Sequence, residues 1–255
     1  MNVVAVYRAQ DDTQDTAVRL AALMGVTVYE ALARLRAPGN GPKVVAVFAG
    51  HDQAVQLDGI LKSGGFHSAI LTAGEIEAES HQRIVKKFTL GERELGVETT
   101  DGGSLMVSYG DIEVILRGTE IGHTTEIQTS KEKSLSLGRA VLTGGIMISK
   151  TTKTVREVTT PQREGFFSLY VRENPPLLFR EKALLYDTLG PALKLSGAAN
   201  LLFLVNELRR RCSGARYDER LLNRAGQAAL LGPSLDPEKH LAVATALLSK
   251  VLRME

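Results

Sequence analysis

Near Ile84 the spacing of apolar residues changes, and no other feature of the sequence narrows the possible folds as much. Before this residue, short β-branched runs alternate with segments of helical spacing, and Gly or Pro residues separate them. After it, apolar residues recur at every second position, which is typical of strands with one buried face. The chain is therefore predicted to be an α+β protein with two differently built parts.

Residues 1–74 predict the element order βααβαβ, a small domain with a three-stranded sheet and helices. Runs of β-branched and apolar residues predict strands at 3–7, 43–49 and 67–72. Apolar residues at helical spacing predict one helix that ends at Gly25, a second that ends before Pro38, and a third over 51–63. Thr27 and Glu30 have the spacing of a capping box at the start of the second helix.

This element order, with Gly64-Gly65-Phe66 between the last helix and the last strand, resembles two families. They are the C-terminal domain of the ribosomal stalk protein and the ClpS-type adaptors of the Clp proteases. The resemblance implies a non-catalytic domain used for protein docking. ClpS adaptors hold the amino end of a substrate with an Asn-Asp pair and a His, and the corresponding stretches here, 8–12 and 34–37, contain neither. The resemblance therefore does not extend to that pocket.

The polar residues 75–83 predict a linker or a short linking helix, and residues 84–212 predict a second domain. Asp101-Gly102-Gly103 indicates a hairpin turn, and a Tyr-x-Asp-Ile turn follows at Tyr109. Further strands are predicted at 166–171, 176–179 and 182–186. An amphipathic helix is predicted at 196–211, and its apolar face comprises Ala198, Leu201, Leu202, Val205 and Leu208. A meander, this turn and a terminal helix together resemble the pleckstrin-homology and GRAM-like superfold. The resemblance implies an antiparallel barrel with a capping helix.

A long insertion, residues 119–165, interrupts this second domain. Its ends are polar and its middle is apolar, so either two extra strands form there or a mobile segment carries a patch that needs a partner. The candidate partner contacts are its large apolar side chains: Leu137, Val141, Leu142, Ile146, Met147 and Ile148.

Residues 213–255 predict a helical tail. Asp218 is predicted to cap a helix that ends at Gly232-Pro233, and Asp236 to cap a second helix that runs through Leu248. Each helix has an apolar stripe, which must be buried on the second domain or on a second copy of the chain.

The sequence contains no coherent set of catalytic, metal-binding or cofactor-binding residues. The five His residues stand far apart, and the single cysteine, Cys212, excludes a disulfide framework. Residues 144–151 imitate a phosphate-binding loop in which Lys150 and Thr151 would contact a nucleotide. A phosphate loop opens a helix, whereas the residues that follow are β-branched, so a Gly-Gly bend between two strands is the preferred interpretation.

Charge and hydropathy limit the partners. With 31 basic and 29 acidic residues the net charge is +2, so nucleic acid ranks below protein as a partner. Phosphoinositide binding is not supported, since the first hairpin loop contains an acid and no base. No apolar run approaches the ~20 residues of a membrane helix. The low cysteine content and the absence of a signal-like N-terminus predict a cytoplasmic protein.

These observations predict a non-enzymatic adaptor or scaffold that binds another protein or its own copy. One alternative is a nucleotide-binding enzyme that uses the loop at 144–151. The other is a weak nucleic-acid binder that uses scattered basic side chains: Lys150, Lys153, Arg156, Arg209, Arg210 and Arg211.

Overall fold

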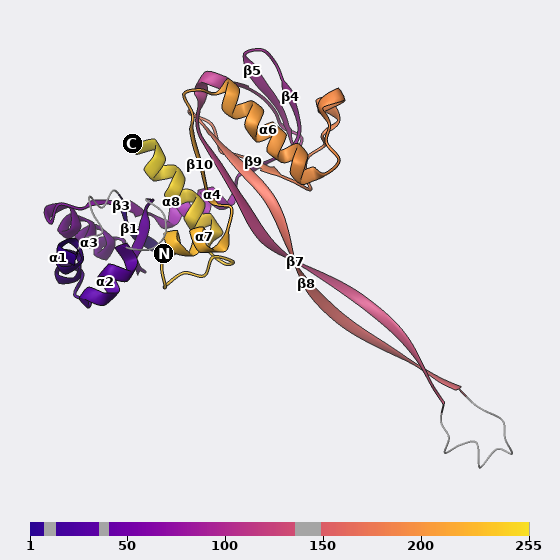
Figure 1. The fold of residues 1–255 in the computed structure, drawn as a ribbon, viewed down its shortest axis with the longest axis horizontal. Coiled ribbons are helices and arrows are strands. Elements are labelled where there is room, and N and C mark those ends of the chain that lie inside the picture. Colours follow the sequence, from indigo (N-terminus) through magenta and orange to yellow (C-terminus); the bar gives the residue numbers. More distant parts are fainter. Residues whose placement is uncertain (8–13, 36–40, 136–148, 255) are drawn as a thin grey trace. The chain divides into compact units, whose positions relative to one another are not determined.

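The computed structural model of the chain describes residues 1–7, 14–35, 41–135 and 149–254, and their side chains except at 122–161. The structure contains both helices and strands, and the strands form a three-stranded and a seven-stranded sheet. This confirms the predicted α+β class (Figure 1). Two compact units are present: Met1–Glu120 with Glu164–Glu255, and Ile121–Arg163. The smaller unit falls within the predicted insertion 119–165.

The N-terminal part has the predicted order βααβαβ. Its elements are β1 (Asn2–Tyr7), α1 (Gln14–Met24), α2 (Val28–Leu35), β2 (Lys43–Phe48), α3 (His51–Ser63) and β3 (His67–Leu71). Strand β1 lies in the centre, antiparallel to both β2 and β3. The capping box at α2 is confirmed, because the Thr27 amide donates to the Glu30 carboxylate and the Glu30 amide donates to Thr27 Oγ1.

The strand β1 is buried on both faces, which explains its nearly continuous apolar sequence. Val4 and Val6 pack in one cluster with side chains of α1, α2 and α3. Val3 and Ala5 point to the opposite face, into a cluster that includes side chains of α7 (Arg224–Leu231) and α8 (Leu241–Met254). Within the described ranges, no single helix has the length and apolar character to cross a membrane; α1 and α2 meet that criterion only as a pair bent by 117°.

Much of the stretch predicted as a linker or a short linking helix, 75–83, is helical. Helix α4 (Ala73–Ser80) begins with a second capping box, in which Thr72 and Glu75 exchange hydrogen bonds. Lys250 of α8 donates to the Glu75 carboxylate and to the Ile70 carbonyl, each at 2.6 Å. These bonds connect α4 and the end of β3 to α8.

The larger sheet has the strand order β10-β7-β8-β9-β4-β5-β6. Its strands are β4 (Arg83–Leu90), β5 (Glu94–Thr99), β6 (Ser104–Ser108), β7 (Ile112–Leu135), β8 (Ser149–Val171), β9 (Leu177–Arg180) and β10 (Arg216–Leu221). Gly102 adopts φ +86° between β5 and β6, which confirms the predicted hairpin turn. The short 3₁₀ helix η1 (Tyr109–Asp111) then leads into β7.

The prediction of a purely antiparallel sheet is wrong, because β9 runs parallel to β4 and β10 runs parallel to β7. The strand predicted at 182–186 is also absent: residues 182 and 183 belong to a turn, residues 184–186 form no regular element, and the Ala183 and Leu184 amides both donate to the Arg180 carbonyl.

The predicted long helix is confirmed as α6 (Gly197–Arg211), and Ser196 Oγ accepts a hydrogen bond from the Ala199 amide at its start. Leu201, Val205 and Leu208 are buried as predicted, but Leu202 is 40% exposed. Leu204 is buried instead of Leu202, so the apolar stripe is displaced around the helix from its predicted position. Before α6 lies a 3₁₀ segment, η2 (Asp187–Ala192).

The tail is not entirely helical, which corrects the prediction for 213–255. Residues Arg216–Leu221 form β10, and α7 begins only after Asn223, whose side chain accepts a hydrogen bond from the Gly226 amide. Asp218 does not cap this helix, because its carboxylate accepts hydrogen bonds from Arg220. The predicted break at Gly232 is confirmed, with φ +66°.

Candidate functional site

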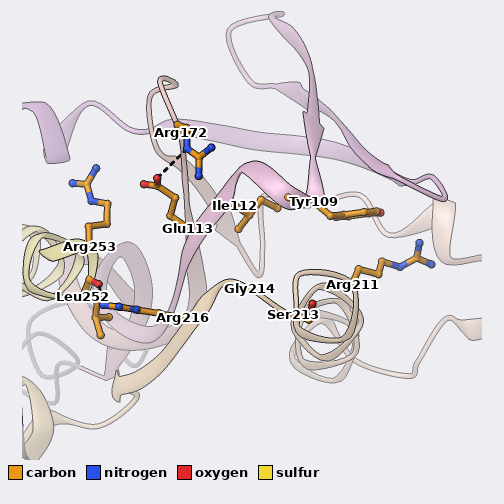
Figure 2. A pocket seen from close by; sticks show the side chains of 11 residues that line it. Tyr109, Ile112, Glu113, Arg172, Arg211, Ser213, Gly214, Arg216, Leu252 and Arg253 are labelled. Atoms are coloured by element: carbon orange, nitrogen blue, oxygen red, sulfur yellow. Dashed lines mark hydrogen bonds and ion pairs between the residues drawn. The ribbon is translucent and has the colours of Figure 1, made fainter. Parts of the chain in front are cut away.

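A polar pocket of about 440 Å³ is lined by four arginines and one carboxylate (Figure 2). The arginines are Arg172, Arg211, Arg216 and Arg253, and the carboxylate is Glu113. We call this the arginine pocket. Parts of the chain that are far apart in sequence build it, and the fold positions each arginine differently.

Strands β7 and β8 supply Glu113 and Arg172. Arg172 directly follows β8, and its backbone amide donates to the Asp111 carbonyl at 2.9 Å, just before β7. Its guanidinium Nε lies 3.4 Å from Glu113 Oε1, and the Arg172 side chain is 62% exposed. An ion pair of this length and exposure contributes little to stability, so Arg172 can change partner at low cost.

Two arginines meet the C-terminal end of α8. Arg216, the first residue of β10, donates to the Leu252 carbonyl, and Arg253 Nε donates to the Ser249 carbonyl at 3.4 Å. Cations are favourable at a helix C-terminus, because the last carbonyls are unsatisfied and the helix dipole is negative there. A guanidinium has five N–H donors, so these bonds use only part of each side chain.

Arg211 belongs to the pocket wall but has other partners. Its guanidinium points away from the other three in Figure 2 and donates to the Gly91 carbonyl at 2.5 Å. It also lies 3.5 Å from the Glu207 carboxylate and 5.5 Å from the centre of the Tyr109 ring. Its positive charge is therefore largely offset inside the protein.

The predicted basic run at the end of α6 is thus occupied by internal contacts. Arg209 stacks over the Tyr217 ring at 3.8 Å, and Arg210 pairs with Glu207 at 2.8 Å. The hydrogen bond from Arg210 also lowers the pKa of Glu207. Of the arginines predicted as nucleic-acid contacts in this run, Arg211 alone lines the arginine pocket.

The other predicted contacts belong to the β7–β8 hairpin. Lys150, Thr151, Lys153 and Arg156 are in β8, where the structure describes the strand but not these side chains. A strand therefore follows the Gly-Gly pair where a phosphate loop has a helix. The six candidate partner contacts lie outside the described residues: Leu137, Val141, Leu142, Ile146, Met147 and Ile148.

A second polar cluster is buried between α4 and β8. Glu79 is 8% exposed, and its carboxylate accepts hydrogen bonds from the Tyr170 hydroxyl and the Gln82 amide. Ser168 Oγ donates to Gln82 Oε1 at 3.0 Å. Burial raises the pKa of Glu79 to about 7, although these hydrogen bonds partly oppose the shift. We call these four residues the Glu79 cluster.

Nowhere in the part of the chain that the structure describes do three or more His, Cys, Asp or Glu side chains gather as a metal site requires.

The buried position of Cys212 predicts an unreactive thiol. Cys212 is 3% exposed, and burial raises its pKa to about 11 in spite of the nearby Arg211. Because the thiolate is the reactive form, we expect a disulfide reagent such as dithionitrobenzoate to label the native protein far more slowly than the protein in guanidinium chloride. Absorbance of the released thiolate measures both rates. Equal rates would show that Cys212 is accessible in the native state.

Sequence reasoning missed Arg172, Arg216 and Arg253, because each is an isolated arginine outside any motif. The parallel pairing of β10 with β7 places Arg216, and no local sequence pattern indicates that pairing. Comparison with known proteins adds nothing to this site: no family model, no curated protein and no solved structure matches the chain.

Proposed function

We propose that the protein is a non-enzymatic adaptor or scaffold of the cytoplasm, which binds another protein through residues 136–148, between β7 and β8. The observation that carries this proposal is the length of the two strands that flank this segment. Strand β7 has 24 residues and β8 has 23, and they are hydrogen-bonded neighbours in the sheet.

The sequence between these strands supports a binding role. Residues 136–148 include six large apolar side chains and a single charged one, Arg139, whereas the adjoining strand sequences are rich in Thr, Lys and Glu. A ribbon of two strands has no interior of its own in which apolar side chains could be buried. An apolar segment next to such a ribbon is therefore a candidate interaction site.

The lining of the arginine pocket agrees with a binding protein. Its titratable side chains are four arginines, Glu113 and Tyr109, and burial raises the pKa of Tyr109. Of the side chains that can act as bases or nucleophiles, the lining includes Glu113 and Ser213 but neither a histidine nor a cysteine.

The test is affinity capture with three forms of the full-length protein. The first is the natural chain and the second carries Val141→Ser, Leu142→Ser and Ile146→Ser. The third, a matched control, carries Met106→Ser and Leu195→Ser. These substitutions remove two exposed apolar side chains that lie outside β7 and β8. We expect a stoichiometric partner to bind the natural and control forms and to be lost from the triple variant.

Recovery of the same partners with all three forms would refute residues 136–148 as the binding segment. Flotation with phospholipid vesicles is the parallel arm, because apolar side chains can also enter a lipid interface. Vesicle binding that the triple substitution abolishes, with no protein partner, would contradict the adaptor proposal.

A further inference from the structure

We propose that the arginine pocket binds a dianionic phosphate monoester. This function is separate from the proposed binding of a protein at residues 136–148, and it depends on different residues.

The charge of the pocket matches this ligand. Four arginines line it, and the carboxylates paired with them are Glu113, which contacts Arg172, and Glu207, which contacts Arg211. Among the described residues, the two positive charges of Arg216 and Arg253 have no ion-pair partner in the pocket, although Arg253 also interacts with the buried Glu79. A phosphate monoester carries about −1.5 to −2 at neutral pH, whereas a simple carboxylate carries about −1 and would compensate only half of that charge.

The positions of three arginines favour several simultaneous contacts to one anion. Arg172 comes from the end of β8, Arg216 from the start of β10, and Arg253 from the end of α8. In Figure 2, Arg216 and Arg253 lie beside Leu252, and Arg172 lies beside Glu113. The planar guanidinium fork fits the oxygens of a phosphate group, and each contact is a charge-assisted hydrogen bond.

A phosphate ligand can replace Glu113 as the partner of Arg172, because their ion pair is long and exposed. At 3.4 Å this pair is longer than a strong charged hydrogen bond, so a phosphate oxygen can compete with Glu113 for the guanidinium. The C-terminal dipole of α8 opposes anion binding, and Arg216 and Arg253 already donate to carbonyls there. The affinity therefore depends on their remaining N–H groups.

The shape of the site favours a monoester over a nucleic-acid backbone. The arginines surround a bounded pocket whose wall also includes Ile112 and Leu252, and the whole chain has a net charge of only +2. Binding to a nucleic-acid backbone requires a track of positive charge over successive phosphodiesters.

Isothermal titration with inorganic phosphate and with phosphoserine tests the proposal. We expect saturable binding of both to the natural protein. Arg172→Gln and Arg253→Gln should each raise the dissociation constant by about 10-fold or more, since each loses a charge-assisted hydrogen bond. The matched control is Arg210→Gln, which removes the same charge from a side chain that is 67% exposed and outside the pocket, and it should leave the constant unchanged. Arg253→Lys keeps the charge but loses the fork and should give an intermediate value.

Two sources of the monoester can be separated in the same experiment. Tighter binding of a phosphoserine peptide than of free phosphoserine would indicate a phosphorylated protein, and equal binding would indicate a small metabolite. Either ranking supports the pocket.

Three results would overturn the proposal. The first is the absence of saturable binding at about 10 mM phosphate. The second is an equal constant for the Arg172→Gln and Arg210→Gln proteins; Arg172 is exposed, so its substitution is expected to leave folding intact. The third is binding of an oligothymidylate without terminal phosphate, weakened by Arg253→Gln, when phosphate itself does not bind. The triple variant of residues 136–148 should bind phosphate normally, so failure of one proposal does not decide the other.

Discussion

Replacement of Phe167 by alanine is expected to lower the free energy of unfolding by about 3–5 kcal/mol. Phe167 is fully buried in β8 and stands opposite Phe179 of β9. The two rings stack with centroids 4.3 Å apart and planes inclined by 12°. The substitution removes the ring from the core and leaves a cavity that the surrounding strands can close only in part.

Urea unfolding followed by circular dichroism measures this effect, with Met106→Ala as the control. Met106 lies on β6 and is 63% exposed, so its truncation should change the free energy of unfolding by less than about 0.5 kcal/mol. The ring of Phe167 belongs to the same cluster as Leu204 and Leu208 of α6. If Phe167→Ala and Met106→Ala change the free energy of unfolding by similar amounts, α6 and the sheet do not share a rigid core.

The elements of residues 1–74 could be predicted because their signals are local. The capping pair Thr27 and Glu30 fixes the start of α2, and helix α3 has the predicted bounds His51–Ser63. Gly102, with its positive φ, likewise identifies the turn between β5 and β6. At each of these places a few adjacent residues determine the backbone without help from distant parts of the chain.

The failure to predict β10 has its cause in a distant partner. Arg216–Leu221 becomes a strand because it pairs with β7, where Tyr217 stands opposite Ile115. Its own sequence has only one fully buried residue, Leu221, so local periodicity did not indicate a strand. The apolar residues after it fit helical spacing, and this led to the wrong start of α7.

The arginine pocket shows the same limitation. The basic run Arg209-Arg210-Arg211 is visible in the sequence, but its side chains contact Tyr217, Glu207 and Gly91 within the protein. The arginines with donors still available are single residues at the ends of three elements, and only the sheet topology brings them together. A single sequence contains no pattern that reports this.

The stability of the protein is expected to fall as the pH rises from about 4.5 to about 7, because of Glu79. Burial raises the pKa of Glu79 from 4.5 to about 7 in the folded protein. Between these values the folded state keeps a proton that the unfolded state has released, so the contribution is complete below 4.5 and is lost as the pH rises through 7. A shift of this size corresponds to about 3 kcal/mol.

Glu79→Gln should abolish this slope, because glutamine keeps an oxygen that can accept the Tyr170 hydrogen bond but has no proton to lose. At pH 8 the variant is expected to be more stable than the natural protein by about 2 kcal/mol, the shift less the cost of a buried amide. Urea unfolding between pH 4.5 and 8.5 measures both curves.

The matched control is Glu75→Gln at the start of α4, which should leave the slope between pH 4.5 and 7 unchanged. Partial burial alone raises the pKa of Glu75, but hydrogen bonds from Lys250 and Thr72 outweigh it and hold the pKa below its usual value. The charged Glu75 therefore stabilises the fold, and this contribution is lost as the pH falls through its folded pKa. If Glu79→Gln leaves the slope between pH 4.5 and 7 unchanged, the carboxylate of Glu79 is hydrated in the folded protein and the Glu79 cluster is open to water.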